Sequence, residues 1–223
     1  MTPDWEQLAA RAAARHDDGL ARLPTDGDER QRQLTRMGNA AWAAGLSYLM
    51  LGRAAEAQGW LLRAAERYRE SWPDAPPESW GRPIGAMKAR LIAGDLEGAR
   101  EDARWALDAG AEKSDSPIGV YAAALAHLVL GDDAAARGLA ERLVGPADFP
   151  TAVADSLVAL AGADGPGYET ASAALVADFE SREEFLEDVP VADTVLALQQ
   201  LADRRGLAGR LASPLLPPAP GRR

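Results

Sequence analysis

The sequence predicts an all-α protein built from antiparallel helical hairpins that stack side by side. Alanine and leucine supply most of the apolar residues, which make up 47% of the chain, and both have high helix propensity. No run of alternating apolar and polar residues lies between turn signals, as a strand would require. A glycine followed five residues later by an alanine also recurs three times, and such recurrence is typical of stacked repeats.

The recurring pattern lies in residues 48–57, 90–99 and 127–136. Its glycines fit the left-handed residue that ends a helix, and its alanines allow two helices to approach closely. Asp95 and Asp132, directly after the second and third glycines, suit the start of a helix, where free backbone N–H groups favour a carboxylate. The glycines are 42 and then 37 residues apart, which suits two helices of about four turns each with their connections.

Residues 39–65 resemble a tetratricopeptide repeat, a family in which helix pairs stack into a right-handed superhelix with a concave ligand-binding groove. The expected tryptophan is displaced by one residue, to Trp42, and the later copies carry Arg90 and His127 where the family has tyrosine. The resemblance covers roughly residues 38–145, and each copy exceeds the usual period of about 34 residues. The family's small, aromatic, turn and alanine positions are matched best in the first copy, by Gly45, Tyr48, Gly52, Ala57 and Ala64.

The resemblance implies a groove along the first helix of each hairpin. Trp42, Ile84 and Tyr121 would form an apolar column there, and Lys88 would be its one charge, suited to a carboxylate. Large apolar patches usually mark interfaces, so a partner peptide, a second copy of the chain in a homodimer, or the chain's own C-terminal helices would cover it. The residues turned inward would be Asn39, Trp42, Leu46, Leu49, Ile84, Lys88, Leu91, Ile118, Tyr121, Leu125 and Leu128.

The chain predicts one continuous domain over residues 1–206. Residues 1–28 form an amphipathic capping helix and a turn, 29–145 the three hairpins, and 146–206 a divergent region with one more helix pair and a final helix. The proline-rich connection 71–83 contains Trp72 and Trp80, and we expect one of them to pack on the hairpins. The tail, 207–223, is expected to be extended or disordered and flexible.

Composition narrows the function. The chain has no cysteine, which excludes disulfides, thiolate nucleophiles and zinc sites built on sulfur. Its formal charge of −10 repels phosphate backbones, so we do not expect a nucleic-acid partner. The N-terminus lacks a basic start followed by an apolar run, and no stretch of eighteen uncharged apolar residues occurs. We therefore expect a soluble cytoplasmic protein with no membrane partner.

Residues 178–193 contain seven carboxylates and one arginine. Several of these acids would share a helix face, where oxygen ligands can hold a divalent cation. A solvated acidic face is the simpler interpretation, and such a face can also recruit a basic partner. The predicted acidic patch consists of Glu180, Glu183, Glu184, Glu187 and Asp188.

No catalytic motif is present in the sequence. His16 and His127 have no carboxylate, serine or second histidine at helical spacing, so we predict packing positions for both. We predict a non-catalytic adaptor, chaperone-like holder or assembly module that binds a protein or peptide and needs no cofactor or metal. Two alternatives remain: an acidic immunity or antitoxin-type protein that neutralises a basic partner, and a helical domain with a closed pocket for a small molecule.

Overall fold

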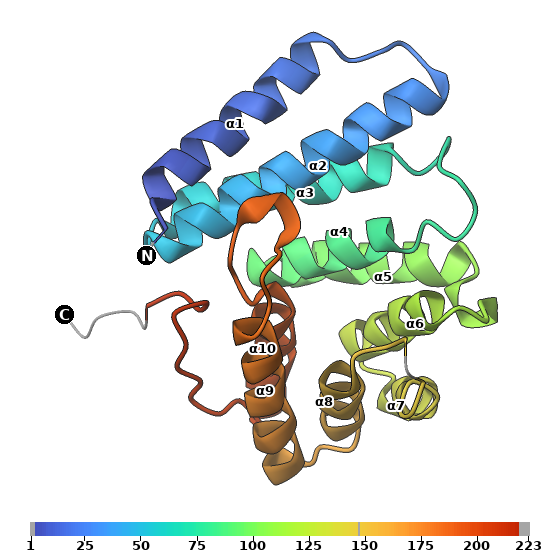
Figure 1. The fold of residues 1–223 in the computed structure, drawn as a ribbon. Coiled ribbons are helices and arrows are strands. Elements are labelled where there is room, and N and C mark those ends of the chain that lie inside the picture. Colours follow the sequence, from blue (N-terminus) through green and yellow to red (C-terminus); the bar gives the residue numbers. More distant parts are fainter. Residues whose placement is uncertain (1–2, 147, 219–223) are drawn as a thin grey trace.

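The computed structural model describes residues 3–146 and 148–218, and the regular structure in these residues is entirely helical. The predicted all-α class is therefore confirmed (Figure 1). In chain order the helices are α1 (Trp5–Ala21), α2 (Gly27–Met50), α3 (Ala54–Glu70), α4 (Gly81–Ile92), α5 (Leu96–Asp108), the 3-10 helix η1 (Ala111–Lys113), α6 (Pro117–Leu130), α7 (Asp133–Glu141), α8 (Thr151–Ala161), α9 (Gly165–Glu180), the 3-10 helix η2 (Leu186–Asp188) and α10 (Asp193–Arg205).

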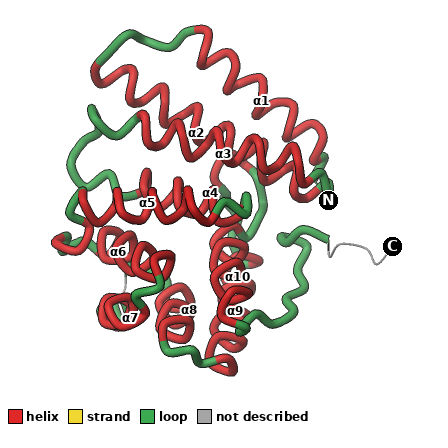
Figure 2. Tube along the Cα trace, turned by 180° about the vertical axis from the view of Figure 1, so that it is seen from behind, coloured by secondary structure: helices red, strands yellow, loops and turns green. Residues whose placement is uncertain are grey.

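Consecutive helices pack against each other in sequence order, which gives a series of layered helix pairs (Figures 1 and 2). Helix α1 packs on α2, and the pairs α2/α3, α4/α5, α6/α7 and α8/α9 follow. The last pair is the additional one that the sequence predicted after residue 149. Helix α10 departs from this order, because it packs against α4 and α8 as well as α9.

The corners of the first three pairs are the glycines of the recurring pattern. Gly52, Gly94 and Gly131 have φ angles of 72°, 77° and 87°, a left-handed conformation in which a side chain is strained. In each corner the next residue's N–H donates to the carbonyl five residues earlier, which closes the end of the helix. These bonds are all 2.9 Å long and join Arg53 to Tyr48, Asp95 to Arg90, and Asp132 to His127.

The fourth corner has the same hydrogen bond without a glycine. The N–H of Asp164 donates to the carbonyl of Ala159 over 2.9 Å, and Ala163 takes the left-handed position with φ of 52°. Asp164 also accepts a hydrogen bond from the N–H three residues later, as do Asp95 and Asp132. These carboxylates cap the starts of three helices, which confirms the predicted role of Asp95 and Asp132.

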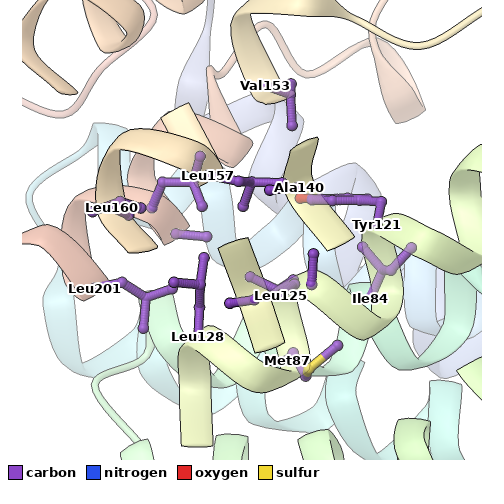
Figure 3. Packing of buried hydrophobic residues seen from close by; sticks show 14 of the residues in the cluster. Ile84, Met87, Tyr121, Leu125, Leu128, Ala140, Val153, Leu157, Leu160 and Leu201 are labelled. Carbon is purple, nitrogen blue, oxygen red and sulfur yellow. The ribbon is translucent and has the colours of Figure 1, made fainter. Parts of the chain in front are cut away.

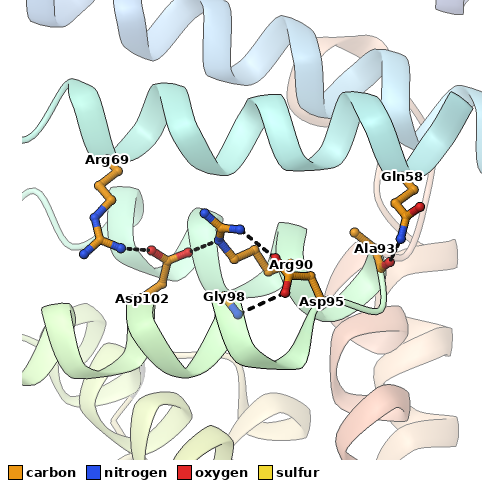
Figure 4. Close-up of polar contacts among 7 residues, drawn as sticks. All are labelled: Gln58, Arg69, Arg90, Ala93, Asp95, Gly98 and Asp102. Carbon is orange, nitrogen blue, oxygen red and sulfur yellow. Dashed lines mark hydrogen bonds and ion pairs between the residues drawn. The ribbon is translucent and has the colours of Figure 1, made fainter.

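A buried carboxylate joins the second hairpin to the first (Figure 4). Asp102 of α5 is fully buried, and its two oxygens lie 2.7 Å from Arg69 of α3 and 2.7 Å from Arg90 of α4. Arg90 also reaches Asp95 at the corner, over 2.6 Å. Burial raises the pKa of Asp102, and the two guanidinium groups oppose that effect. The network ties three consecutive helices together.

The connection between α3 and α4 packs on the hairpins, as expected. Trp80 is buried and Trp72 is half-buried. The ring of Trp72 lies 5.7 Å from that of Trp80 and 5.5 Å from that of Trp105 in α5, measured between centroids. Because edge-to-face aromatic contacts add to area burial, this cluster fixes the connection to α5.

The tail differs in part from its prediction. Residues 219–223 lie outside the described residues, but residues 207–218 run as an extended segment along α9 and α10. The N–H of Ala192 donates to the carbonyl of Leu215 over 2.9 Å, and Gln199 donates to the carbonyl of Gly209 over 2.6 Å. Leucines of this segment pack against the core, so residues 207–218 are not a disordered tail.

Candidate binding groove

The inner face is the side of α2, α4, α6 and α8 on which the sequence placed a groove, and α10 fills much of it. Leu201 of α10 lies in the same apolar cluster as Leu128 and Leu160 (Figure 3). Of the three coverings that the sequence left open for the apolar column, the structure shows the chain's own C-terminal region: Trp42, Ile84 and Tyr121 are exposed by only 3%, 7% and 7%. Four more predicted groove residues are core residues with at most 2% exposure, namely Leu46, Leu91, Leu125 and Leu128.

Polar contacts hold α10 at both ends. At its start, the Lys88 ammonium lies 3.0 Å from the Asp193 carboxylate and donates to the Thr194 hydroxyl over 2.9 Å. At its end, Arg205 donates to the carbonyl of Leu128 over 2.9 Å and pairs with Asp133 at 2.6 Å. Helix α10 is thus an integral part of the packed structure.

The segment 181–192 between α9 and α10, which we call the strap, covers the inner face of α2. Its Val189 and Val191 belong to one apolar cluster with Trp42 and Leu46, and a small cavity of about 100 Å³ remains beneath it. The prediction that these acids share one helix face is therefore wrong. Helix α9 ends at Glu180, and the other four acids of the predicted patch lie in the strap.

The acids of the patch have separate surroundings. Glu180 accepts a hydrogen bond from Ser213, and Glu187 pairs with Arg15 of α1 at 2.7 Å. Glu183, Glu184 and Asp188 are exposed. Nowhere in residues 3–146 and 148–218 do three or more histidine, cysteine or acidic side chains meet in a way that could hold a metal ion.

Beside α10, the inner face keeps a first pocket of about 330 Å³ between α2 and α4. Lys88 and Asp193 close one end, and Arg82 contributes a second cation that the sequence prediction missed, because that prediction treated residue 82 as part of a connection. The other lining residues are Thr35, Asn39, Trp42, Tyr68, Ser79, Gly81, Ile84, Gly85 and Leu186.

Tyr68 reaches this pocket from α3, behind the inner helices. A Cβ atom placed on Gly38 of α2 or on Gly85 of α4 would lie 2.8 Å from the Tyr68 ring, so both glycines provide the space through which the ring passes. The Tyr68 hydroxyl donates to the side-chain oxygen of Asn39 over 2.9 Å. Burial raises the pKa of Tyr68, and the carboxylate of Asp193 adds to this effect.

A second pocket of about 420 Å³ lies between the starts of α6 and α8. It is mainly apolar, and its charged residues are Asp148 and Arg182. The Tyr121 hydroxyl is buried without a hydrogen-bond partner in the described structure. The rings of Tyr121 and Phe149 are 5.6 Å apart. The lining is completed by Pro117, Ile118, Pro150, Val153 and Thr194.

The two pockets adjoin at the start of α10, because Asp193 lines the first and Thr194 the second. We call the combined depression the inner groove. Ile118, which lines the second pocket, and Leu186, which lines the first, are 43% and 53% exposed. The predicted residues that line it are Asn39, Trp42, Ile84, Lys88, Ile118 and Tyr121. Leu49 does not line it; this side chain is half-buried against the apolar cluster that contains Trp42 and Leu46.

Both histidines occupy packing positions, as predicted. His16 of α1 is buried with its ring edge-on to Trp60 at 5.3 Å. His127 is also buried, but it has a carboxylate partner that helical spacing did not indicate: Glu112 of η1 lies 2.6 Å from its Nε2 atom. The contact between His127 and Glu112 joins the corner after α6 to η1, which precedes α6.

Comparisons with family models, with curated proteins and with solved structures find no match for this chain.

Within residues 3–146 and 148–218, no helix combines the length and the apolar character needed to cross a lipid bilayer.

Proposed function

We propose that this protein is a non-catalytic binding module of the tetratricopeptide-like kind, which takes a protein or peptide segment in its inner groove. The proposal is supported by four helix pairs with one corner geometry, packed in sequence order. Packing of this kind presents an extended surface on one side, which suits recognition. The groove in question is narrower than the sequence predicted, since Leu46, Leu91, Leu125 and Leu128 are core residues that do not line it.

The observation that carries the proposal is the position of Ile118 and Leu186. Large apolar side chains are more than 40% exposed at only four of the described positions, and these two flank the inner groove. The pocket beside Ile118 offers two aromatic rings and little charge. Apolar surface around a concave site is the usual mark of a place where another molecule binds.

The other two exposed side chains, Leu20 and Val144, provide matched controls, because they are 49% and 47% exposed and line neither pocket. We expect Ile118→Ser or Leu186→Ser to reduce the amount of a specific partner recovered by affinity purification from the native cell, identified by mass spectrometry. Leu20→Ser and Val144→Ser should recover as much as the unchanged protein. Equal recovery with all four variants would contradict binding at the groove.

The acidic alternative depends on the strap. Glu183, Glu184 and Asp188 are exposed, and together they would steer a basic partner through long-range attraction. This function predicts that partner recovery falls steeply with added salt and that Glu183→Gln with Glu184→Gln abolishes it, while Ile118→Ser has no effect. The two proposals therefore give opposite results for the same variants.

A further inference from the structure

Within residues 3–146 and 148–218, Arg82 has no carboxylate partner. Its half-buried guanidinium donates from Nε to the Ser71 hydroxyl over 2.8 Å and from Nη2 to the side-chain oxygen of Gln31. Both acceptors are neutral. Burial lowers the pKa of Arg82, with no opposing carboxylate close by. A half-buried guanidinium that lines a pocket and has no carboxylate partner is suited to bind an anion there.

The carboxylate that lines the same pocket and the one bound to Gln31 already have partners. Asp193, which lines the same pocket, pairs with Lys88 at 3.0 Å. Asp28 lies on the far side of Gln31, where it accepts from the Gln31 amide over 2.7 Å and pairs with Arg32 at 2.8 Å. The Nη1 atom of Arg82 has no hydrogen-bond acceptor in the described part of the chain, so this donor is available to a ligand.

The start of α4 adds a second donor to the same pocket. Gly81 is the first residue of this helix, and its N–H has no acceptor in the described residues. The preceding Trp80 provides no side-chain cap, which leaves the positive end of the helix open. The hydroxyls of Thr35 and Ser79 also line the pocket, but they donate to the backbone carbonyls of Gln31 and Pro76. A guanidinium without a carboxylate partner and a free amide beside one cavity favour an acceptor with several oxygens.

We propose that the first pocket binds an oxyanion, a carboxylate or phosphate group of a ligand, with Arg82 as its main contact and the Gly81 amide as its second. Trp42 and Ile84 form an apolar wall for the remainder of the ligand. A volume of about 330 Å³ lies at the small end of ligand cavities. The site goes beyond the proposed groove function, since it needs no macromolecular partner.

The protein's charge of −10 does not prevent such binding. At physiological ionic strength the field of distant charges is screened over about 8 Å, so the groups within the pocket decide the affinity. A hydrogen bond from a guanidinium to an anion is roughly twice as strong as one between neutral groups. The overall charge should slow anion entry more than it weakens the bound state.

The experiment is an NMR titration of the full chain with inorganic phosphate and, separately, with acetate, at constant ionic strength set with chloride. We expect a saturable shift of the Gly81 amide and the Trp42 indole N–H with at least one anion. Arg82→Gln should weaken that binding about tenfold or more, equivalent to about 1.4 kcal/mol, and Arg82→Lys should weaken it less. Arg104→Gln, at an exposed arginine of α5 that lines neither pocket, should leave it unchanged.

A response to phosphate alone would identify a phosphate-bearing ligand, and a response to acetate would identify a carboxylate-bearing one. The proposal is wrong if neither anion moves the Gly81 amide of the unchanged protein in a saturable way, or if Arg104→Gln weakens binding as much as a folded Arg82→Gln. The circular dichroism spectrum shows whether Arg82→Gln is folded, and the result with the unchanged protein stands without that variant. Loss of partner capture by Ile118→Ser has no bearing on this outcome.

Discussion

The ammonium of Lys88 in α4 lies 3.0 Å from the carboxylate of Asp193 at the start of α10. The pair is largely shielded from solvent, with side chains 11% and 20% exposed. Lys88 also donates to Thr194, 106 residues away in the sequence, and its ammonium lies 5.5 Å from the centre of the Trp42 ring. This contact fixes the start of α10 against the inner face, where the two pockets of the inner groove adjoin.

We expect Lys88→Met and Asp193→Asn each to reduce the free energy of unfolding by about 1–3 kcal/mol, between the values for exposed and for buried ion pairs. Urea unfolding of both variants and their combination gives the coupling energy of the pair. The exposed pair of Arg137 and Glu141 is the control, with an expected coupling of about 0.5 kcal/mol or less. A coupling no larger than the control would show that the contact does not hold α10.

Gly38→Ala and Gly85→Ala should each destabilise the protein by about 1–3 kcal/mol, because the added methyl group would press on the Tyr68 ring. Gly138, an exposed glycine within α7, has no atom within 4 Å of its Cβ position. Gly138→Ala should therefore stabilise the protein by about 0.5–1 kcal/mol. Thermal unfolding of the three variants tests this. If Gly38→Ala and Gly85→Ala stabilised the protein as Gly138→Ala is expected to, Tyr68 would not pass between α2 and α4.

Removing Arg90 should be costly, since it leaves the buried Asp102 with only Arg69. We expect Arg90→Met to reduce stability by about 3–5 kcal/mol. Arg90→Met combined with Asp102→Leu should recover much of this loss, because no unpaired buried carboxylate remains. Denaturant unfolding provides both values. A double variant that is less stable than Arg90→Met would contradict the role assigned to this network.

Glu78 links stability to pH. Its carboxylate accepts hydrogen bonds from Ser114, Trp80 and Ser116, which lower its pKa below the ordinary 4.5. The ionised form of Glu78 is thus favoured in the folded state. Its contribution to the stability of the fold is present at a pH above the pKa that Glu78 has in the unfolded chain. That contribution is lost as the pH falls through the lower pKa that Glu78 has in the folded protein. The indole N–H signal of Trp80 should titrate below pH 4.5, and Ser114→Ala should move that titration to higher pH. Titration at or above the ordinary value would contradict the assignment.

The sequence predicted the corners well because their chemistry is local. Gly52, Gly94 and Gly131 mark left-handed ends of helices, and a single residue decides that conformation. The fourth corner, between α8 and α9, was not predicted from a glycine. Ala163 takes the same left-handed conformation there, so the corner geometry occurs in one more hairpin than the glycine pattern does. Arg90 and His127 are the departures from the repeat pattern. Arg90 carries the ion pair with Asp102, and His127 carries the hydrogen bond with Glu112.

The candidate site was harder to predict because it depends on contacts distant in sequence. The register of the repeat resemblance predicted Ile84, Lys88 and Tyr121 on one face, but a register does not identify what covers that face. Whether Leu125 meets solvent, a partner or α10 is decided by the return of residues 193–205 to α4 and α8. Arg82 carried no periodic signal, and its importance follows only from the neutral acceptors that surround it.

The most direct test of the binding proposal uses the absence of cysteine in this chain, which makes any introduced cysteine a unique attachment point. A photoactivatable cross-linker is placed on Ile118→Cys and Leu186→Cys, and on Leu20→Cys and Val144→Cys as equally exposed controls, in the native cell extract. The account predicts that positions 118 and 186 cross-link to the same protein partner and that positions 20 and 144 do not. Equal cross-linking from all four positions, or none from 118 and 186, would contradict a partner in the inner groove.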